Sequence, residues 1–352
     1  MDGRHILQFE RGATMKWLML IMLMLGSVAC SPAHRPTGTQ TDIATEEPFV
    51  PLVDHHQHLM SAAGAEQTKR PDSDPEKEVS ARQLIEMLDD AGIRRAVVLS
   101  GAYYFDGVDQ LGRPDVHQRV SRENDWTAEQ IAPFPDRLIA LCSFNPVADH
   151  AIPEMRRCAK SGKFAGLKLH FASTGTTITN PDHLDRVRRV FRTANELRMP
   201  ILAHVAGREG YGREHAEIIL NQILPEAPDI PVIIAHLWGG GGVSEPALAA
   251  YADAISAGHP ATKNLRFELA QATTAAGAGS YEMLARRMRQ IGLDRMYYGS
   301  DGPQFGGAPP EAMCEHFREN MPLTDEEMNI IANNVAPFVV AAFRDEGESE
   351  SP

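Results

Sequence analysis

Eight short apolar runs alternate with helix-like segments along most of this chain of 352 residues. The runs are Phe49–Leu59, Arg95–Ser100, Leu138–Phe144, Ala165–Phe171, Ile201–Val205, Val232–Leu237, Leu265–Leu269 and Met296–Gly299. Helical patterns lie between them, for example at Ser80–Ala91, Pro181–Leu197, Glu214–Leu224 and Tyr281–Ile291. Strands that are buried on both faces of a parallel sheet have this continuous apolar character. The sequence therefore predicts an α/β fold with a single domain, a (β/α)8 TIM barrel.

A doubly wound α/β sheet is the alternative architecture. Such a sheet normally has a glycine-rich phosphate-binding turn after its first strand, but this chain has Asp54-His55-His56-Gln57-His58 there. The four consecutive glycines at 239–242 follow the sixth apolar run and are interpreted as a loop that needs close backbone approach. Both observations favour the barrel, which we expect to occupy residues 49–345, followed by an acidic tail at 346–352.

The start of the chain resembles an export signal. A lysine precedes nine apolar residues at 17–25, and small residues follow at 26–29. The apolar segment is too short to cross a bilayer. We therefore expect residues 1–29 to be a signal peptide, with Met15 as an alternative start.

Cys30 would be the first residue after cleavage, which resembles the lipobox of bacterial lipoproteins and predicts lipidation of Cys30. Simple secretion is the alternative, because Ser27 and Ala29 also fit an ordinary cleavage site. Residues 30–48 are polar and predict a flexible tether. These features predict an exported protein, a periplasmic or cell-envelope lipoprotein. Since Ser31 is not aspartate, resemblance to lipoproteins favours the outer membrane if the source has two.

The formal net charge of -13 argues against nucleic acid or an anionic membrane surface as a partner. We expect a small-molecule substrate, and contact with a membrane through the lipid anchor only. The sequence carries no prediction of oligomeric state. Three further cysteines, Cys142, Cys158 and Cys314, are widely spaced and form no zinc knuckle. Cys142 is expected to be a small buried residue, with a Cys142–Cys158 bridge as the alternative in an oxidising compartment.

Polar residues stand where the predicted strands end, and the carboxyl ends of barrel strands form the rim that carries active sites. They are His56, His58, Lys168, His170, His204, His236 and Asp301. Residues two apart on a strand share a face, so His56 and His58 can converge while His55 faces away. Three or four nitrogen and oxygen ligands around an open position predict a catalytic zinc or a related divalent ion.

Several separated motifs resemble the metal-dependent amidohydrolase superfamily, in the branch that also holds aminocarboxymuconate-semialdehyde decarboxylase. The motifs are Asp54-x-His56-x-His58, Ala203-His204, Ala235-His236, Gly299-Ser300-Asp301-x-Pro303, Asn124-Asp125-Trp126 through Pro135-Asp136-Arg137-Leu138, and Ile330-Ile331-Ala332-Asn333-Asn334. The resemblance implies four ligands to one divalent ion, expected to be Zn²⁺: His56, His58, His204 and Asp301. It also places His236 near the water that the ion holds. In binuclear relatives a carbamylated lysine on the fourth strand bridges two ions, and Lys168 stands at that position.

Asp301 and His236 are the predicted catalytic residues: Asp301 shuttles the proton and His236 stabilises the oxygen that becomes negative. Four residues at or after the ends of strands four to six are expected to bind the substrate or to lie behind the metal ligands: Lys168, His170, Arg208 and Trp238. The predicted function is hydrolysis of a small amide, lactone or ester through a metal-activated water. Export favours hydrolysis over the first alternative, non-oxidative decarboxylation of a small carboxylic acid. The second alternative is a metal-containing lipoprotein that binds without catalysis.

Overall fold

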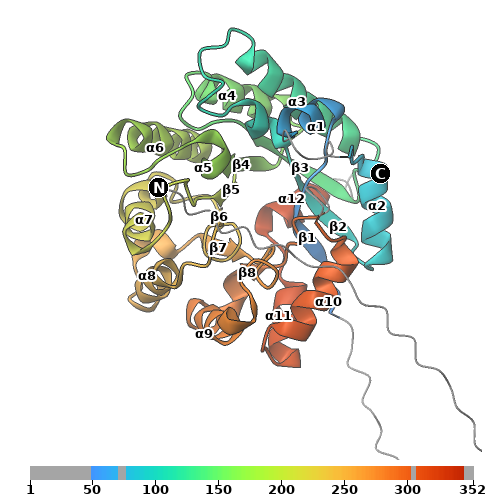
Figure 1. Cartoon of the computed structure of the whole chain (residues 1–352), viewed down its shortest axis with the longest axis vertical. Coiled ribbons are helices and arrows are strands. Elements are labelled where there is room, and N and C mark those ends of the chain that lie inside the picture. Colours follow the sequence, from blue (N-terminus) through green and yellow to red (C-terminus); the bar gives the residue numbers. More distant parts are fainter. Residues whose placement is uncertain (1–48, 70–76, 303–306, 345–352) are drawn as a thin grey trace, which may run out of the picture. The chain divides into compact units, whose positions relative to one another are not determined.

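The computed structural model describes residues 49–69, 77–302 and 307–344. Within them, eight parallel strands pair in sequence order and form the ring seen in Figure 1. The strands are β1 Val53–Gln57, β2 Arg95–Leu99, β3 Leu138–Ser143, β4 Gly166–His170, β5 Ile201–His204, β6 Val232–Ile234, β7 Leu265–Glu268 and β8 Met296–Tyr297. Backbone hydrogen bonds from His55 N to Tyr298 O (2.9 Å) and from Asp301 N to His56 O (2.8 Å) join the first strand to the segment after the last. The predicted single-domain (β/α)8 barrel is confirmed.

Helices alternate with the strands along the chain, and most of them lie on the outside of this ring (Figure 1). They are α1 Ala62–Thr68, α2 Ala81–Asp90, α3 Val116–Ile131, α4 Ala151–Ser161, α5 Phe171–Thr174, α6 Pro181–Glu196, α7 Arg213–Ile218, α8 Glu245–Ser256, α9 Tyr281–Ile291, α10 Pro310–Asn320, α11 Asp325–Asn333 and α12 Pro337–Arg344. Sequence signals set several starts. Ser80 and Gln83 form a capping box before α2, and Thr324 and Glu327 form another before α11. No helix in the described ranges is both long and apolar enough to span a bilayer.

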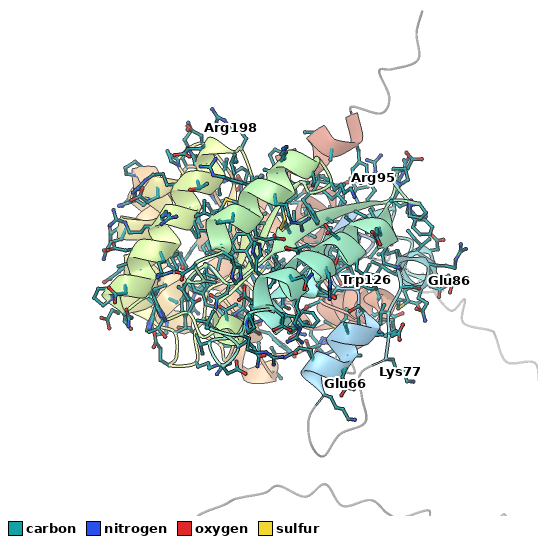
Figure 2. All side chains as sticks on the ribbon, turned by 90° about the horizontal axis from the view of Figure 1, so that it is seen from above. Glu66, Lys77, Glu86, Arg95, Trp126 and Arg198 are labelled. Carbon is teal, nitrogen blue, oxygen red and sulfur yellow. A yellow bond between two sulfur atoms is a disulfide. The ribbon has the colours of Figure 1, made fainter. Side chains whose placement is uncertain are left out.

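Two apolar layers form the core, one outside the ring of strands and one inside it. The larger layer packs the outer faces of the strands against the helices. The smaller fills the barrel interior with side chains such as Val97, Leu141 and Ile233, and Val339 of α12 belongs to it. Figure 2 shows the barrel from the side, with Arg95 at the start of β2 and Arg198 just before β5 near one end, and Glu66 and Lys77 towards the opposite end. Helix α12 packs on the interior layer and leaves the carboxyl rim open. The carboxyl rim is where (β/α)8 barrels carry their active sites.

The predicted leader (1–29), Cys30, the tether (30–48) and the acidic tail (346–352) lie outside the described residues. The predicted first strand, Phe49–Leu59, is shorter in the structure, where β1 begins only at Val53. The predicted helix Glu214–Leu224 is divided: α7 ends at Ile218, and a π-helical turn continues from Ile219 to Ile223. The next turn, Leu224–Glu226, has Pro225 near its start, since proline is tolerated at the first positions of a helix and not in its interior.

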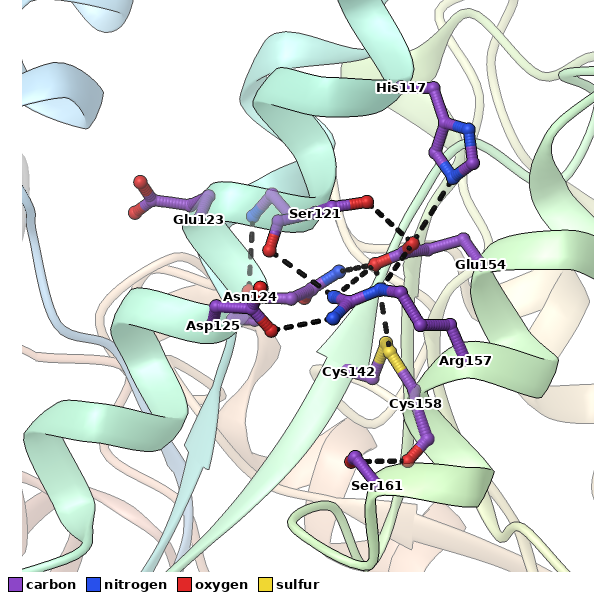
Figure 3. A network of polar contacts seen from close by, with 12 residues as sticks. His117, Ser121, Glu123, Asn124, Asp125, Cys142, Glu154, Arg157, Cys158 and Ser161 are labelled. Carbon is purple, nitrogen blue, oxygen red and sulfur yellow. Dashed lines mark hydrogen bonds and ion pairs between the residues drawn. A yellow bond between two sulfur atoms is a disulfide. The ribbon is translucent and has the colours of Figure 1, made fainter.

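Cys142 of β3 and Cys158 of α4 form a disulfide, with their Cα atoms 6.4 Å apart. The expectation that Cys142 is simply a small buried residue is therefore wrong, and the alternative holds. Figure 3 shows the bridge beside Glu154, a buried carboxylate that accepts from Asn124 Nδ2 (2.8 Å) and Arg157 Nη2 (2.8 Å). Helical packing on β3 brings the two sulfurs together, although their 16-residue separation gave no recognisable spacing motif.

Removing this bridge through Cys142→Ala and Cys158→Ala together is expected to lower the free energy of unfolding by about 3 kcal/mol, because a closed loop of this length restricts the unfolded chain. Urea unfolding of the wild type with and without a thiol reductant measures the same effect. The double variant should not respond to the reductant. Equal stability of oxidised and reduced wild type would contradict the prediction.

Candidate metal centre

A cavity of about 210 Å³ opens at the carboxyl end of the barrel. Its lining contains all but one of the residues that the sequence placed at the site. The lining residues are His56, His58, Tyr103, Tyr104, Lys168, His170, His204, His236, Trp238, Gly240, Gly241, Gln271, Ala275 and Asp301. The ends of β1, β4, β5 and β6 and the segment after β8 thus meet at one point.

His56, His58 and Asp301 bring three possible ligand atoms close together in the cavity. Asp301 Oδ1 lies 3.3 Å from His56 Nε2 and 3.4 Å from His58 Nε2. One nitrogen from each histidine and one oxygen of Asp301 lie within 4.8 Å of one another. As predicted, His55 faces away: its Nδ1 donates to Tyr298 O (3.0 Å) and its Nε2 accepts from Ala336 N (3.2 Å). Two nitrogens and a carboxylate converging in this way form a donor set for Zn²⁺ or a similar ion.

Hydrogen bonds set the tautomers of the two convergent histidines. His56 Nδ1 donates to Glu268 Oε1 (2.8 Å) and His58 Nδ1 donates to Leu99 O (3.0 Å), since neither oxygen can donate. Each Nε2 therefore keeps its lone pair and is the nitrogen nearest Asp301. Burial lowers the pKa of both imidazoles well below the usual value. Both are neutral at pH 7, the state that binds a metal.

His204, the fourth predicted ligand, lies in the same cavity but not within the group of atoms that lie within 4.8 Å of one another. Its ring stacks on His170, with centroids 4.0 Å apart and planes at 12°. Burial lowers its pKa to about 3. In the described part of the chain its Nδ1 is buried and has no hydrogen-bond partner. Leaving such a nitrogen unpaired costs free energy, and an ion held there would remove that cost.

Six aromatic side chains form a closed ring of contacts around the cavity. Centroid distances run from 4.0 to 6.3 Å along the circuit His56, His58, Tyr103, His170, His204, His236 and back to His56. Lys168 Nζ lies 3.1 Å from His56 Nε2, and burial lowers its pKa to about 8. Tyr103 also lines the cavity, but the sequence did not identify it as a site residue. It comes from the 3-10 turn Gly101–Phe105, directly after β2, which is the signal that could have identified it.

His236 lies beyond the end of β6, which stops at Ile234 although the sequence predicted a strand up to Leu237. The backbone turns there, because His236 and Leu237 have φ values of 54° and 61°. His236 Nδ1 donates to Ala270 O (3.0 Å), so Nε2 is unprotonated in the neutral ring. Burial lowers the pKa of His236 to about 4. At neutral pH this imidazole offers Nε2 as an acceptor.

The residues that the sequence predicted to contact the substrate differ in where they lie. His170 lines the cavity, and its Nδ1 accepts from Ser173 N (3.2 Å), so in the neutral ring its Nε2–H can donate. Trp238 also lines the cavity and donates from Nε1 to Gly241 O (3.3 Å). Arg208 lies outside: its exposed guanidinium donates from Nε to Ala172 O (2.8 Å). The carbonyls that end α5 hold the arginine, so it brings no charge to the cavity.

Two buried carboxylates behind the lining were not singled out as site residues from the sequence. Glu268 ends β7 and is fully buried. Asp54 accepts from His56 N (3.0 Å) and Ser300 N (3.1 Å), joining β1 to the segment that carries Asp301. Burial raises the pKa of Asp54 to about 6. Asp54 was noticed only within the motif of the first strand, and Glu268 only as part of the seventh apolar run.

Gly240→Ala is expected to displace His204 and weaken metal binding. A Cβ at Gly240 would lie 2.0 Å from His204 Nε2, and its φ of 98° disfavours any L side chain. Gly242→Ala is the matched control, because a Cβ there meets nothing within 4 Å. Calorimetric titration with Zn²⁺ compares the two variants. Equal affinity would show that the Gly240 contact does not hold His204 in place.

Comparisons with known proteins agree with this geometry. The family profile described as amidohydrolase matches residues 53–333. No match was found among the curated proteins. Among solved structures, 2,6-dihydroxybenzoate decarboxylase from Rhizobium aligns with a TM-score of 0.59 at 17% identity, covering 85% of this chain and 100% of that one.

Two further structures show the same fold. A probable 2-pyrone-4,6-dicarboxylic acid hydrolase from Acinetobacter baumannii, with citric acid bound, has a TM-score of 0.53 at 16% identity over 84% of this chain and 100% of its own. A dihydroxybenzoic acid decarboxylase from Polaromonas, with bound manganese and an inhibitor, has a TM-score of 0.57 at 14% identity, covering 84% of this chain and 98% of its own. Because the family match spans most of the chain, this chain belongs to the amidohydrolase family.

Proposed function

We propose that this protein is a metal-dependent hydrolase of a small amide, lactone or ester. The observation that carries the proposal is the position of Asp301. Its Oδ1 lies beside both ligand nitrogens of His56 and His58, and its Oδ2 lies 4.0 Å from His236 Nδ1. One carboxylate therefore spans the ion site and the cavity wall, where a proton leaving water would be accepted.

The residues of the cavity divide the chemistry among them. When bound, a divalent ion lowers the pKa of water and polarises a carbonyl. Asp301 accepts the proton from the attacking water and returns it to the leaving group. His236 was expected to stabilise a negative oxygen, but its hydrogen bond to Ala270 O leaves Nε2 without a proton, so we assign it an acceptor's role. Lys168 and the Nε2–H of His170 are then the donors that hold the substrate's oxygen.

Lys168 is the only lysine or arginine among the described residues that line the cavity. Its ammonium favours a substrate with a carboxylate or a developing oxyanion. We propose one ion, held by His56, His58, His204 and Asp301. A carbamate on Lys168 with a second ion is the alternative. Nitrogen and carboxylate donors suit Zn²⁺, and they also suit manganese, which two structures of similar fold contain.

Non-oxidative decarboxylation is the second candidate. The observation that favours it is that several solved structures of the same fold are decarboxylases of hydroxylated benzoates. In that reaction Lys168 would hold the substrate carboxylate, and Asp301 would deliver a proton to carbon. The same cavity residues would bind the substrate in both reactions, which differ in the bond that breaks.

Isotope labelling separates the two candidates. The purified, metal-analysed protein is screened against lactones, amides, esters and aromatic acids, first in H2¹⁸O and then in D2O. Hydrolysis places ¹⁸O in the acid product, whereas decarboxylation releases CO2 and leaves deuterium on carbon. No turnover on any class by fully loaded protein would support the metal-containing binding protein instead.

We also propose that the protein is exported. The Cys142–Cys158 disulfide supports this, because such bridges persist in oxidising compartments. Incorporation of labelled palmitate by the wild type, and not by Cys30→Ala, tests the lipid anchor. An unlabelled soluble wild type that begins at Cys30 would indicate simple secretion.

A further inference from the structure

We propose that Glu268 is a positioning residue that holds the ligand His56 and the acceptor His236 in one fixed relation. The inference rests on the proposed metal-dependent function and adds a residue to it. Glu268 is the last residue of β7 and is fully buried. It is absent from the cavity lining, so it acts through its neighbours.

Three N–H groups converge on the carboxylate of Glu268. Oε1 accepts from His56 Nδ1 (2.8 Å) and from the backbone N–H of His236 (2.7 Å). Oε2 accepts from the backbone N–H of Ala270 (2.8 Å). The donors come from β1, from the turn after β6 and from the turn after β7. All three of these partners are donors, which is the arrangement that the two oxygens of a carboxylate accept.

The contact between Glu268 and His56 leaves Nε2 of His56 free of a proton and able to bind the ion. Since Nδ1 donates to the carboxylate, the lone pair of His56 stays on Nε2, the atom nearest Asp301. A carboxylate behind a metal-binding imidazole fixes the ring's orientation and raises its basicity. A neutral acceptor of the same shape would raise the basicity of the imidazole less.

The contact with His236 stabilises an unusual backbone. His236 and Leu237 both have left-handed φ values, which residues with a Cβ rarely adopt. Glu268 bonds both: its side chain accepts from His236 N, and its main-chain oxygen accepts from Leu237 N (2.6 Å). The same residue thus determines where the ring of His236 stands.

Gly299 makes room for this arrangement. A Cβ at Gly299 would lie 2.7 Å from Glu268 Oε2 and 2.7 Å from His56 Cβ. The glycine after β8 therefore lets the carboxylate and the first ligand pack side by side. Four segments of the rim meet at Glu268.

The test measures metal affinity, without any substrate, in the full chain. Glu268→Gln keeps the shape of the side chain, but its NH2 must face at least one of the three N–H donors. We expect the affinity for Zn²⁺, measured by competition with a chromogenic chelator, to fall by about tenfold to a hundredfold. The absorption spectrum of the Co²⁺-loaded variant should also change, since the geometry around the ion depends on His56.

Glu154→Gln is the matched control. Glu154 is an equally buried carboxylate, bonded to Ser121, Asn124 and Arg157, none of which lines the cavity (Figure 3). It should lower the midpoint of thermal unfolding and leave the Zn²⁺ affinity and the Co²⁺ spectrum unchanged. Glu268→Asp, which keeps the charge and shortens the reach, should also weaken binding and supplies the test if Glu268→Gln does not fold.

Wild-type affinity and spectrum in Glu268→Gln or Glu268→Asp would overturn the inference and leave the proposed function standing. An equal loss of affinity in Glu154→Gln would also overturn it, because general destabilisation would then explain the effect. If the wild type itself binds neither Zn²⁺ nor Co²⁺, the proposed function fails first.

Discussion

Asp301→Asn is expected to lower turnover by about a hundredfold to ten-thousandfold, with much less change in substrate affinity. Asparagine keeps a neutral oxygen of similar shape beside His56 and His58, but it cannot accept the proton. The measurement is kcat and KM on the substrate that the screen identifies, with the bound metal determined for each preparation. Metal content must be known because Asp301 also lies among the ligand atoms.

His236→Asn is the companion variant for Asp301→Asn. It should also lower turnover while keeping the ion, because His236 lies against Glu268 and Ala270 and is expected to face the reacting water. If it removes the ion as efficiently as changes to His56 and His58, then His236 is a ligand and the two-ion hydrolase becomes the better description. Near-normal turnover by Asp301→Asn would refute the mechanism even with the fold correct.

Replacing both His56 and His58 with alanine is expected to abolish metal binding, from about one ion per chain to none. The two Nε2 atoms are the neutral, preoriented nitrogens of the centre, and no other imidazole of the described cavity lies within 4.8 Å of both of them and Asp301. Elemental analysis of dialysed protein measures the occupancy. Full occupancy in the double variant would show that the ion lies elsewhere.

His117 and His150 provide a matched control pair for that experiment. Their rings stack with centroids 4.8 Å apart, and each faces a buried carboxylate, but neither lines the cavity. Replacing both with alanine should leave the ion in place. The metal content of Lys168→Ala distinguishes one ion from two. Retention of one ion supports the single-ion centre, and loss of all metal would make Lys168 essential to its assembly.

Much of the site follows from positions along the chain. The short continuous apolar runs of the strands and the helical patterns between them are local properties, so the eight strands and their order could be predicted. A parallel barrel brings all carboxyl ends to one rim, and this alone places His56, His58, His204, His236 and Asp301 in one cavity. Arg208 shows the limit of that argument. It follows β5 as the others follow their strands, but the carbonyl of Ala172 holds its guanidinium outside.

The sequence by itself determined the barrel, the rim and the residue types that gather there. Only the tertiary structure decided which nitrogen of each imidazole carries the proton, since the deciding partner of His56 is 212 residues away at Glu268. The same holds for the Cys142–Cys158 bridge, which depends on how α4 packs against β3. Hydrogen bonds and disulfides join atoms that are neighbours in space. Periodicity describes neighbours in sequence, so it cannot specify pairs that only the closed barrel brings together.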